Sequence, residues 1–163
     1  MKLVLACLAA PAFLISCQSA APADARAARA SQTSCATDSD ARQVSGTIKS
    51  FFAALAKDDD AAVTRLTTSD FYAYDVGKRY TGPELSRLIA DLHRSGRVLE
   101  WNIGPVDARI DCNLAFAAWE NVGASGTASE MKPRTWLESA LLVREDDRWL
   151  IRFLHSTPKD PRP

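Results

Sequence analysis

The sequence predicts an α+β fold, a cone-shaped roll in which three N-terminal helices pack on a curved antiparallel sheet. Three observations lead to this fold class. Apolar residues recur at helical spacing before residue 96, and a period of two dominates from residue 98 onward. The 163 residues, 47% of them apolar, give room for one globular domain of ordinary size. A bent sheet covered by helices leaves a conical hollow for side chains or a small molecule.

The first 16 residues have the pattern of a secretory signal peptide. Lys2 is their only charge, and the apolar run that follows is too short to span a bilayer of about 30 Å. The Leu14-Ile15-Ser16-Cys17 segment resembles the lipobox of bacterial lipoproteins, which predicts that Cys17 is acylated and anchors the chain in the cell envelope. Gln18 follows the cysteine, and by resemblance to Gram-negative sorting signals this residue favours an anchor in the outer membrane, with the domain facing the periplasm. The alternative is ordinary cleavage at residues 19–25, which leaves a soluble periplasmic or secreted protein.

Residues 17–39 are small and polar, and they predict a disordered tether between membrane and domain. Two cysteines remain once Cys7 is removed with the signal peptide and Cys17 is acylated. In an oxidising compartment, Cys35 and Cys112 are expected to form a disulfide that ties the tether to the domain. The alternative is two separate thiols.

Three amphipathic helices and a short strand come first in the predicted domain, residues 40–158. The first helix begins at Asp40, with Gln43 completing a capping box, and buries one apolar face that ends at Leu55. Asp59 or Asp60 caps a short second helix. A strand is expected over residues 71–75. The third helix starts at the Thr81-Gly82-Pro83-Glu84 capping box and ends at Gly96.

From residue 98 onward, apolar and polar residues alternate with the period of two that is typical of β-strands. Strands are expected over residues 98–110, with a bend at Gly104-Pro105, and over 114–122, 134–144 and 148–157. The small residues of 123–132 predict a flexible hairpin loop. Residues 159–163 are proline-rich and are expected to be frayed.

Several segments in this order resemble the nuclear transport factor 2-like superfamily, in particular its SnoaL-like branch of small exported domains. The similarity spans residues 42–158. It depends on the 48–55 helix followed by Asp59-Asp60, on the 80–85 segment, and on an ending that runs from Trp149 to His155 and Thr157, where the family usually has Ser. The resemblance implies the roll fold. Since the superfamily includes isomerases, dehydratases, cyclases, a kinase association domain and binding-only members, it does not imply one activity.

The last predicted strand offers a histidine. Alternation places Trp149, Ile151, Phe153 and His155 on one face, and because three of these are large and apolar, that face is expected to point into the hollow. An imidazole at its open end could act as a general acid or base near neutral pH. The alternative is a cross-strand hydrogen bond.

Two carboxylates are candidates for the other half of an acid–base pair. Glu120 and Glu138 each lie on an otherwise apolar face of a predicted strand, where desolvation raises a carboxyl pKa unless a cation is near. The catalytic hypothesis pairs Glu138 or Glu120 with His155. The alternative is a cross-strand ion pair at the solvated end of the sheet.

Aromatic side chains are expected to line the pocket, although the same residues could fill the core. The expected ligand-binding residues are Tyr72, Tyr74, Trp119, Trp136 and Phe153, with Asp75 at the mouth.

The 20 basic and 20 acidic side chains balance, so no nucleic-acid partner is expected. No phosphate loop, zinc motif or C-x-x-C pair appears, and neither a metal nor another cofactor is expected.

Three functions are consistent with this sequence. The first is a lipid-anchored envelope protein that binds a small, largely apolar ligand without catalysis, which predicts an open apolar pocket. The second is an isomerase, dehydratase or cyclase that uses His155 and a carboxylate, which predicts that the two groups lie within about 3 Å or one water of each other. The third is an interaction module that forms a homodimer through an exposed apolar sheet face.

Overall fold

The computed structural model describes residues 37–159. The predicted signal peptide, the acylation site Cys17, nearly all of the tether including Cys35, and residues 160–163 lie outside the described residues, and their predictions stay predictions. Within residues 37–159, none of the helices has the length and apolar character needed to span a bilayer.

Three helices form where the sequence predicts them: α2 (Asp38–Leu55), α3 (Asp60–Leu66) and α4 (Gly82–Arg94). Asp59 caps α3, and Glu84 accepts hydrogen bonds from the backbone and hydroxyl of Thr81 at the start of α4. The predicted capping box of α2 is wrong by one turn. Thr37 is the N-cap and Asp40 its partner, because the Asp40 carboxylate turns back to the Thr37 N–H and hydroxyl.

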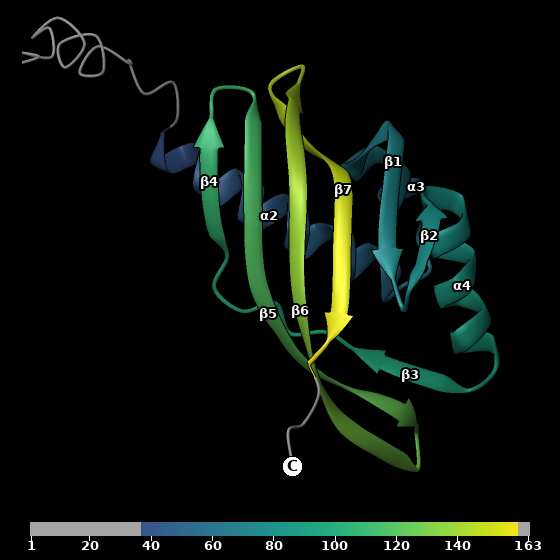
Figure 1. The fold of residues 1–163 in the computed structure, drawn as a ribbon. Coiled ribbons are helices and arrows are strands. Elements are labelled where there is room, and N and C mark those ends of the chain that lie inside the picture. Colours follow the sequence, from purple (N-terminus) through teal and green to yellow (C-terminus); the bar gives the residue numbers. More distant parts are fainter. Residues whose placement is uncertain (1–36, 160–163) are drawn as a thin grey trace, which may run out of the picture. The chain divides into compact units, whose positions relative to one another are not determined.

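Seven strands form one sheet: β1 (Thr67–Asp75), β2 (Lys78–Thr81), β3 (Arg97–Glu100), β4 (Asp107–Asp111), β5 (Leu114–Thr127), β6 (Glu130–Glu145) and β7 (Arg148–Pro158). Their order is β2-β1-β7-β6-β5-β3, and β4 pairs with the first part of β5. Figure 1 shows α2 crossing one face of this sheet while the long β5–β6 hairpin bends towards β3.

The predicted curved sheet is confirmed and is mostly antiparallel, but parts of it differ from the prediction. The sheet is not wholly antiparallel, because β1 pairs with β7 in parallel; alternation along a strand does not encode the direction of its neighbour. The predicted loop at 123–132 is instead the continuation of β5 and β6 around a turn at residues 128–129. Glycine makes this paired stretch feasible, since a Cβ at Gly123 would lie 1.8 Å from the Glu100 carbonyl oxygen on β3.

The core lies between the helices and the inner sheet face. Ring pairs connect α2 to the sheet: Phe51 packs edge-on against Phe71, and Phe52 against Trp119. The outer sheet face carries apolar side chains that stay 46–54% exposed, namely Leu114, Phe116, Val122 and Leu137.

Candidate functional site

A cavity of about 330 Å³ lies between the inner sheet face and helices α2 and α4. Its polar or charged lining residues are Asp75 on β1, Glu138 on β6 and Ser156 on β7. The others are apolar or aromatic: Phe52, Leu55, Ala73, Val76, Leu85, Leu88, Ile89, Leu92, Leu99, Trp101, Trp136 and Leu154. We refer to this space as the Glu138 cavity. A small apolar space with a few converging polar groups is the usual form of a ligand site.

Glu138 accepts more side-chain hydrogen bonds than the other polar residues that line the cavity. It is 5% exposed, and its Oε2 accepts hydrogen bonds from the Trp119 indole N–H at 2.7 Å and from the Asn121 amide at 3.1 Å. Its Oε1 accepts from the Ser156 hydroxyl at 3.0 Å. Asn121 is itself fully buried, and its Oδ1 accepts the backbone N–H of Asn102 at 3.0 Å. Three strands therefore fix one carboxyl group in place.

Burial dominates the electrostatics of Glu138. Loss of water raises its pKa from 4.5 to about 7, although the hydrogen bonds from Asn121, Ser156 and Trp119 oppose the rise. The negative charge of Asp75 adds to it. Near neutral pH this carboxyl group is therefore present in both protonation states, as a general acid or base requires.

Asp75 ends β1 at the edge of the cavity. Burial raises its pKa as well, while a backbone hydrogen bond at Val76 and the charge of His155 act in the opposite direction. The two-residue turn that follows, Val76 and Gly77 at positive φ, reverses the chain into β2 and leaves the Asp75 carboxyl group at the cavity wall.

His155 does not face the Glu138 cavity, so its predicted position is wrong. Leu142 pairs with Ile151 and Leu141 with Phe153, which leaves Arg152 as an extra residue in β7. This bulge reverses the alternation beyond it, because one inserted residue turns each later side chain to the opposite face. His155 is exposed and lines an adjoining depression with Tyr74 and Lys78, whereas Ser156 lines both this depression and the Glu138 cavity.

The other predicted site residues divide between the two faces. Glu120 lies on the outer face, where it is exposed and bonded to Lys159 at 3.1 Å, so its predicted pairing with His155 does not occur. Tyr72, Tyr74 and Phe153 also miss the cavity and pack together on the outer face, with ring centroids 5.1–5.6 Å apart. On β1 the residues that line the cavity are Ala73 and Asp75, and Tyr72 and Tyr74 alternate with them on the opposite face.

Trp136 lines the cavity as predicted. Trp119 is buried on the same face but serves as a hydrogen-bond donor to Glu138 instead of a wall. Sequence reasoning missed Asn121 and Ser156. Asn121 lies two residues after Trp119 on β5, so alternation places both side chains on the same face. The inward position of Ser156 depends on the bulge in β7, which the sequence does not reveal.

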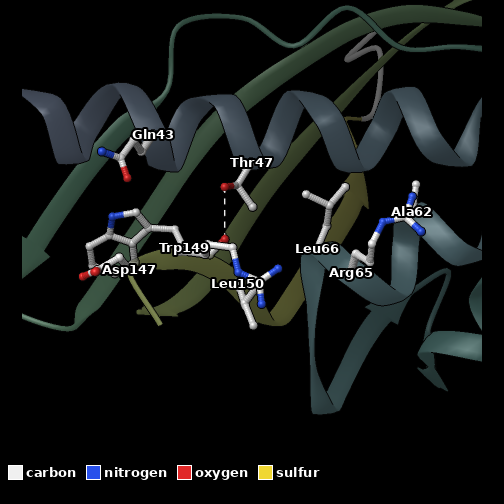
Figure 2. Close-up of a pocket in the computed structure, with 9 residues that line it drawn as sticks. Gln43, Thr47, Ala62, Arg65, Leu66, Asp147, Trp149 and Leu150 are labelled. Atoms are coloured by element: carbon white, nitrogen blue, oxygen red, sulfur yellow. Dashed lines mark hydrogen bonds between the residues drawn. The ribbon is translucent and has the colours of Figure 1, made fainter. Parts of the chain in front are cut away.

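A second depression, of about 470 Å³, lies where α2 and α3 meet the start of β7 (Figure 2). The Thr47 hydroxyl donates to the Trp149 carbonyl at 3.1 Å and holds α2 to the strand there. The charged lining residues Arg65, Asp147 and Arg148 are all exposed. This depression lacks a buried titratable side chain, and the Glu138 cavity is the stronger candidate site.

Comparisons with known proteins support the fold. No family model matches the chain, and no curated protein matches it in sequence. A proposed dehydratase of the NTF2-like family from Streptomyces avermitilis aligns with a TM-score of 0.66 at 15% identity, over 76% of this chain and 98% of its own. A ketosteroid isomerase-like protein from Erwinia carotovora atroseptica gives a TM-score of 0.63 at 15% identity, over 77% and 100%.

The S. rosetta CaMKII hub is also similar, with a TM-score of 0.63 at 14% identity over 72% of this chain and 95% of the hub. At such identities the similarity concerns the fold alone. Three helices on a curled, mostly antiparallel sheet, shared with these structures over about three quarters of the chain, give this protein the fold of the nuclear transport factor 2-like superfamily.

Proposed function

We propose that the domain binds a small, largely apolar molecule in the Glu138 cavity. The observation that carries this proposal is the cavity itself: about 330 Å³ lined mainly by apolar and aromatic side chains, with Glu138 and Ser156 hydrogen-bonded to each other at its wall. Apolar walls supply affinity, and a small set of oriented polar groups selects how the ligand lies.

The direct test is native mass spectrometry of the protein purified from its own host. We expect a bound molecule whose mass disappears in Leu88→Trp, because Leu88 lines the cavity and a larger ring there fills it. Leu137→Trp is the matched control, since Leu137 is 46% exposed on the outer face. A protein that carries no molecule and also fails to bind the hydrocarbon tetralin would contradict the proposal.

A second candidate function is acid–base catalysis. The observation that favours it is two carboxyl groups with raised pKa, Glu138 and Asp75, at one apolar cavity. This pair replaces the His155-based pair expected from the sequence. A carboxyl group with a pKa of about 7 can take a proton from carbon and return it to another carbon, as an isomerase requires, or give it to a hydroxyl group that leaves as water, as a dehydratase requires.

Deuterium exchange would detect this activity without knowledge of the natural substrate. In D₂O, the hydrogens next to the carbonyl group of 1-tetralone should exchange faster with protein than without it, as followed by NMR. Glu138→Gln should remove the acceleration and His155→Gln should keep it, because Glu138 lines the cavity and His155 does not. Equal acceleration by the wild type and Glu138→Gln would count against catalysis by Glu138.

We further propose that the protein is exported and lipid-anchored through Cys17, facing the periplasm from the outer membrane. The support is the charged start, short apolar run and lipobox-like Leu14–Cys17 segment of the sequence. Cys17→Ser should move the protein from the membrane to the soluble fraction. Retention of that variant in the membrane fraction would contradict acylation at Cys17, and release of the wild type would favour the soluble periplasmic alternative.

The proposed Cys35–Cys112 disulfide would join the tether to the domain. Cys112 lies in the exposed turn between β4 and β5, where its side chain is accessible from outside the domain. Peptide mapping without reductant should identify the cross-linked pair, and alkylation of both thiols before reduction would exclude it.

We also propose a homodimer that buries the outer sheet face. Leu114, Phe116 and Val122 stay about half exposed there, and apolar side chains gathered on an exposed face are a feature of protein–protein interfaces. Phe116→Lys should halve the mass measured by sedimentation, and Lys49→Glu on the exposed side of α2 should leave it unchanged. A wild-type monomer would contradict the proposal.

A further inference from the structure

The two oxygens of Glu138 have different surroundings. Oε2 accepts from Trp119 and Asn121, and both of these are N–H groups that cannot take a proton in return. Neither residue lines the cavity, whereas Ser156, the partner of Oε1, does. Oε2 is therefore turned into the protein, and Oε1 is turned towards the cavity. When Glu138 is neutral, its proton resides on Oε1.

Oε1 of Glu138 and Oγ of Ser156, 3.0 Å apart, act as one polar unit, which we call the Glu138–Ser156 dyad. With Glu138 ionised, the dyad has one hydrogen, and the hydrogen bond between the two oxygens uses it. The cavity then meets only lone pairs. With Glu138 neutral, the dyad has two hydrogens, and one is left to point into the cavity.

We propose that the Glu138–Ser156 dyad selects uncharged ligands that carry a hydrogen-bond acceptor oxygen, such as a ketone or ester, and that it binds them together with one proton. This inference rests on the proposed ligand-binding function and specifies its ligand class. An acceptor oxygen matches the single free hydrogen of the neutral dyad. It meets only lone pairs in the ionised dyad, and an unpaired polar contact in an apolar cavity is unfavourable. An anionic ligand would in addition lie against Asp75.

Other titratable groups near the dyad are few among the described residues. Helices α2 and α4, the segment after β3, and the β5 residues Trp119 and Asn121 contribute apolar, aromatic or amide groups. Strand β1 contributes Asp75, whose charge favours the neutral form of Glu138, and His155 of β7 acts on Asp75 from the outer face. Asp75 and His155 are therefore the residues substituted in the control variants.

The experiment compares 1-tetralone with tetralin, which has the same ring system without the oxygen, by equilibrium dialysis against the full chain from pH 5.5 to 8.5. Tetralin should bind equally well across this range. The affinity for tetralone should fall by about 30-fold, because a carboxyl group with a pKa of about 7 loses its neutral form over these pH units.

Variants assign the effect to the dyad. Glu138→Gln should bind tetralone tightly at every pH, since its amide keeps the carbonyl oxygen towards Trp119 and Asn121 and supplies hydrogens to Ser156 and the cavity. His155→Gln should show the same fall in tetralone affinity as the wild type. Asp75→Asn should shift this fall to lower pH, because the charge that raises the pKa of Glu138 is removed. A fall that persists in Glu138→Gln, or tetralone affinity that does not change with pH in the wild type, would overturn the inference. Tetralin binding would then still support the proposed function, and failure to bind either molecule would overturn both.

Discussion

Trp119 and Glu138 lie directly opposite each other in the β5–β6 ladder, and the indole N–H of Trp119 donates a 2.7 Å hydrogen bond to the Glu138 carboxylate. The pair therefore belongs to the sheet and not to a loop. A cross-strand pair of this kind is fixed by register, so the carboxyl group is held in place before any ligand arrives.

Glu138→Gln should change how stability depends on pH. The pKa of Glu138 is raised from 4.5 to about 7 by folding, so between these values the unfolded chain ionises while the native protein keeps its proton. Over this interval the wild type should therefore lose roughly 3 kcal/mol more unfolding free energy than the variant. Urea unfolding at pH 5 and pH 8 measures the difference.

Asp75 serves as the control for this measurement. Its pKa is also raised by burial, so it contributes a loss of the same sign that Glu138→Gln retains. Only the difference between wild type and variant reports on Glu138. Parallel pH profiles for the two proteins would mean that Glu138 is already ionised, or is solvated, in the native state.

Trp119→Phe should destabilise the protein more at pH 8 than at pH 5. Phenylalanine keeps the edge-on contact with Phe52 but removes one of the two donors to Oε2, a loss felt most by the ionised carboxylate. The extra loss at pH 8 should be about 1–2 kcal/mol, typical of a hydrogen bond to a charged group. The pKa of Glu138 should rise accordingly.

Trp101→Phe is the matched variant. Trp101 also packs on Phe52, with ring centroids 5.7 Å apart, but it makes no hydrogen bond to Glu138. Trp101→Phe should lower the free energy of unfolding by the same amount at pH 5 and at pH 8. A pH-dependent loss in Trp101→Phe as large as that in Trp119→Phe would show that packing, and not the donor, sets the effect.

Much of the fold could be predicted from the sequence because its signals are local. The Thr81–Glu84 capping box, the left-handed Gly96 and the polar break at Asp59 mark helix ends through contacts a few residues apart. The parallel pairing of β1 with β7 joins residues about 80 positions apart, such as Tyr72 with Phe153. Alternation along either strand is the same whether the pair is parallel or antiparallel.

The candidate site was predictable where strands are regular and unpredictable where one is not. Glu138 shares a face with Ala140 and Leu142, and its burial follows from that parity. His155 was assigned by the same reasoning from Ile151, but the bulge at Arg152 intervenes. Arg152 is exposed and bonded to Asp70 on β1, a tertiary contact that spacing along β7 does not reveal.

Asp40→Ala should destabilise the domain by about 3 kcal/mol, the usual cost of leaving one partner of a buried ion pair alone. Asp40 is 4% exposed, accepts from the Thr37 N–H and hydroxyl, and pairs with Arg144, which stacks over the Trp149 ring. Glu84→Ala removes the corresponding capping residue of α4, which is exposed and has only local partners, and should destabilise the domain less than Asp40→Ala does. Chemical unfolding of both variants measures the two losses, and equal losses would show that the Arg144 contact adds nothing.

Gly123→Ala and Gly46→Ala should have opposite effects on stability. A Cβ at Gly123 would meet the Glu100 carbonyl oxygen at 1.8 Å and its carbon at 2.8 Å, and these are backbone atoms of the paired strand β3 that cannot rotate away. We expect a loss of about 3 kcal/mol or more, with β3 displaced from β5. Gly46 lies on the exposed side of α2 with nothing within 4 Å, so alanine there should stabilise the helix by about 0.5–1 kcal/mol.

The glycine pair also tests the strand assignment of residues 123–127. If this segment were the flexible loop that its composition predicts, Gly123→Ala would change stability by no more than a few tenths of a kcal/mol, as exposed substitutions generally do. Hydrogen exchange gives an independent reading. The amides of Val98 and Glu100, on the strand that pairs with this segment, should exchange slowly in the wild type and rapidly in Gly123→Ala, while those of β4 keep their protection.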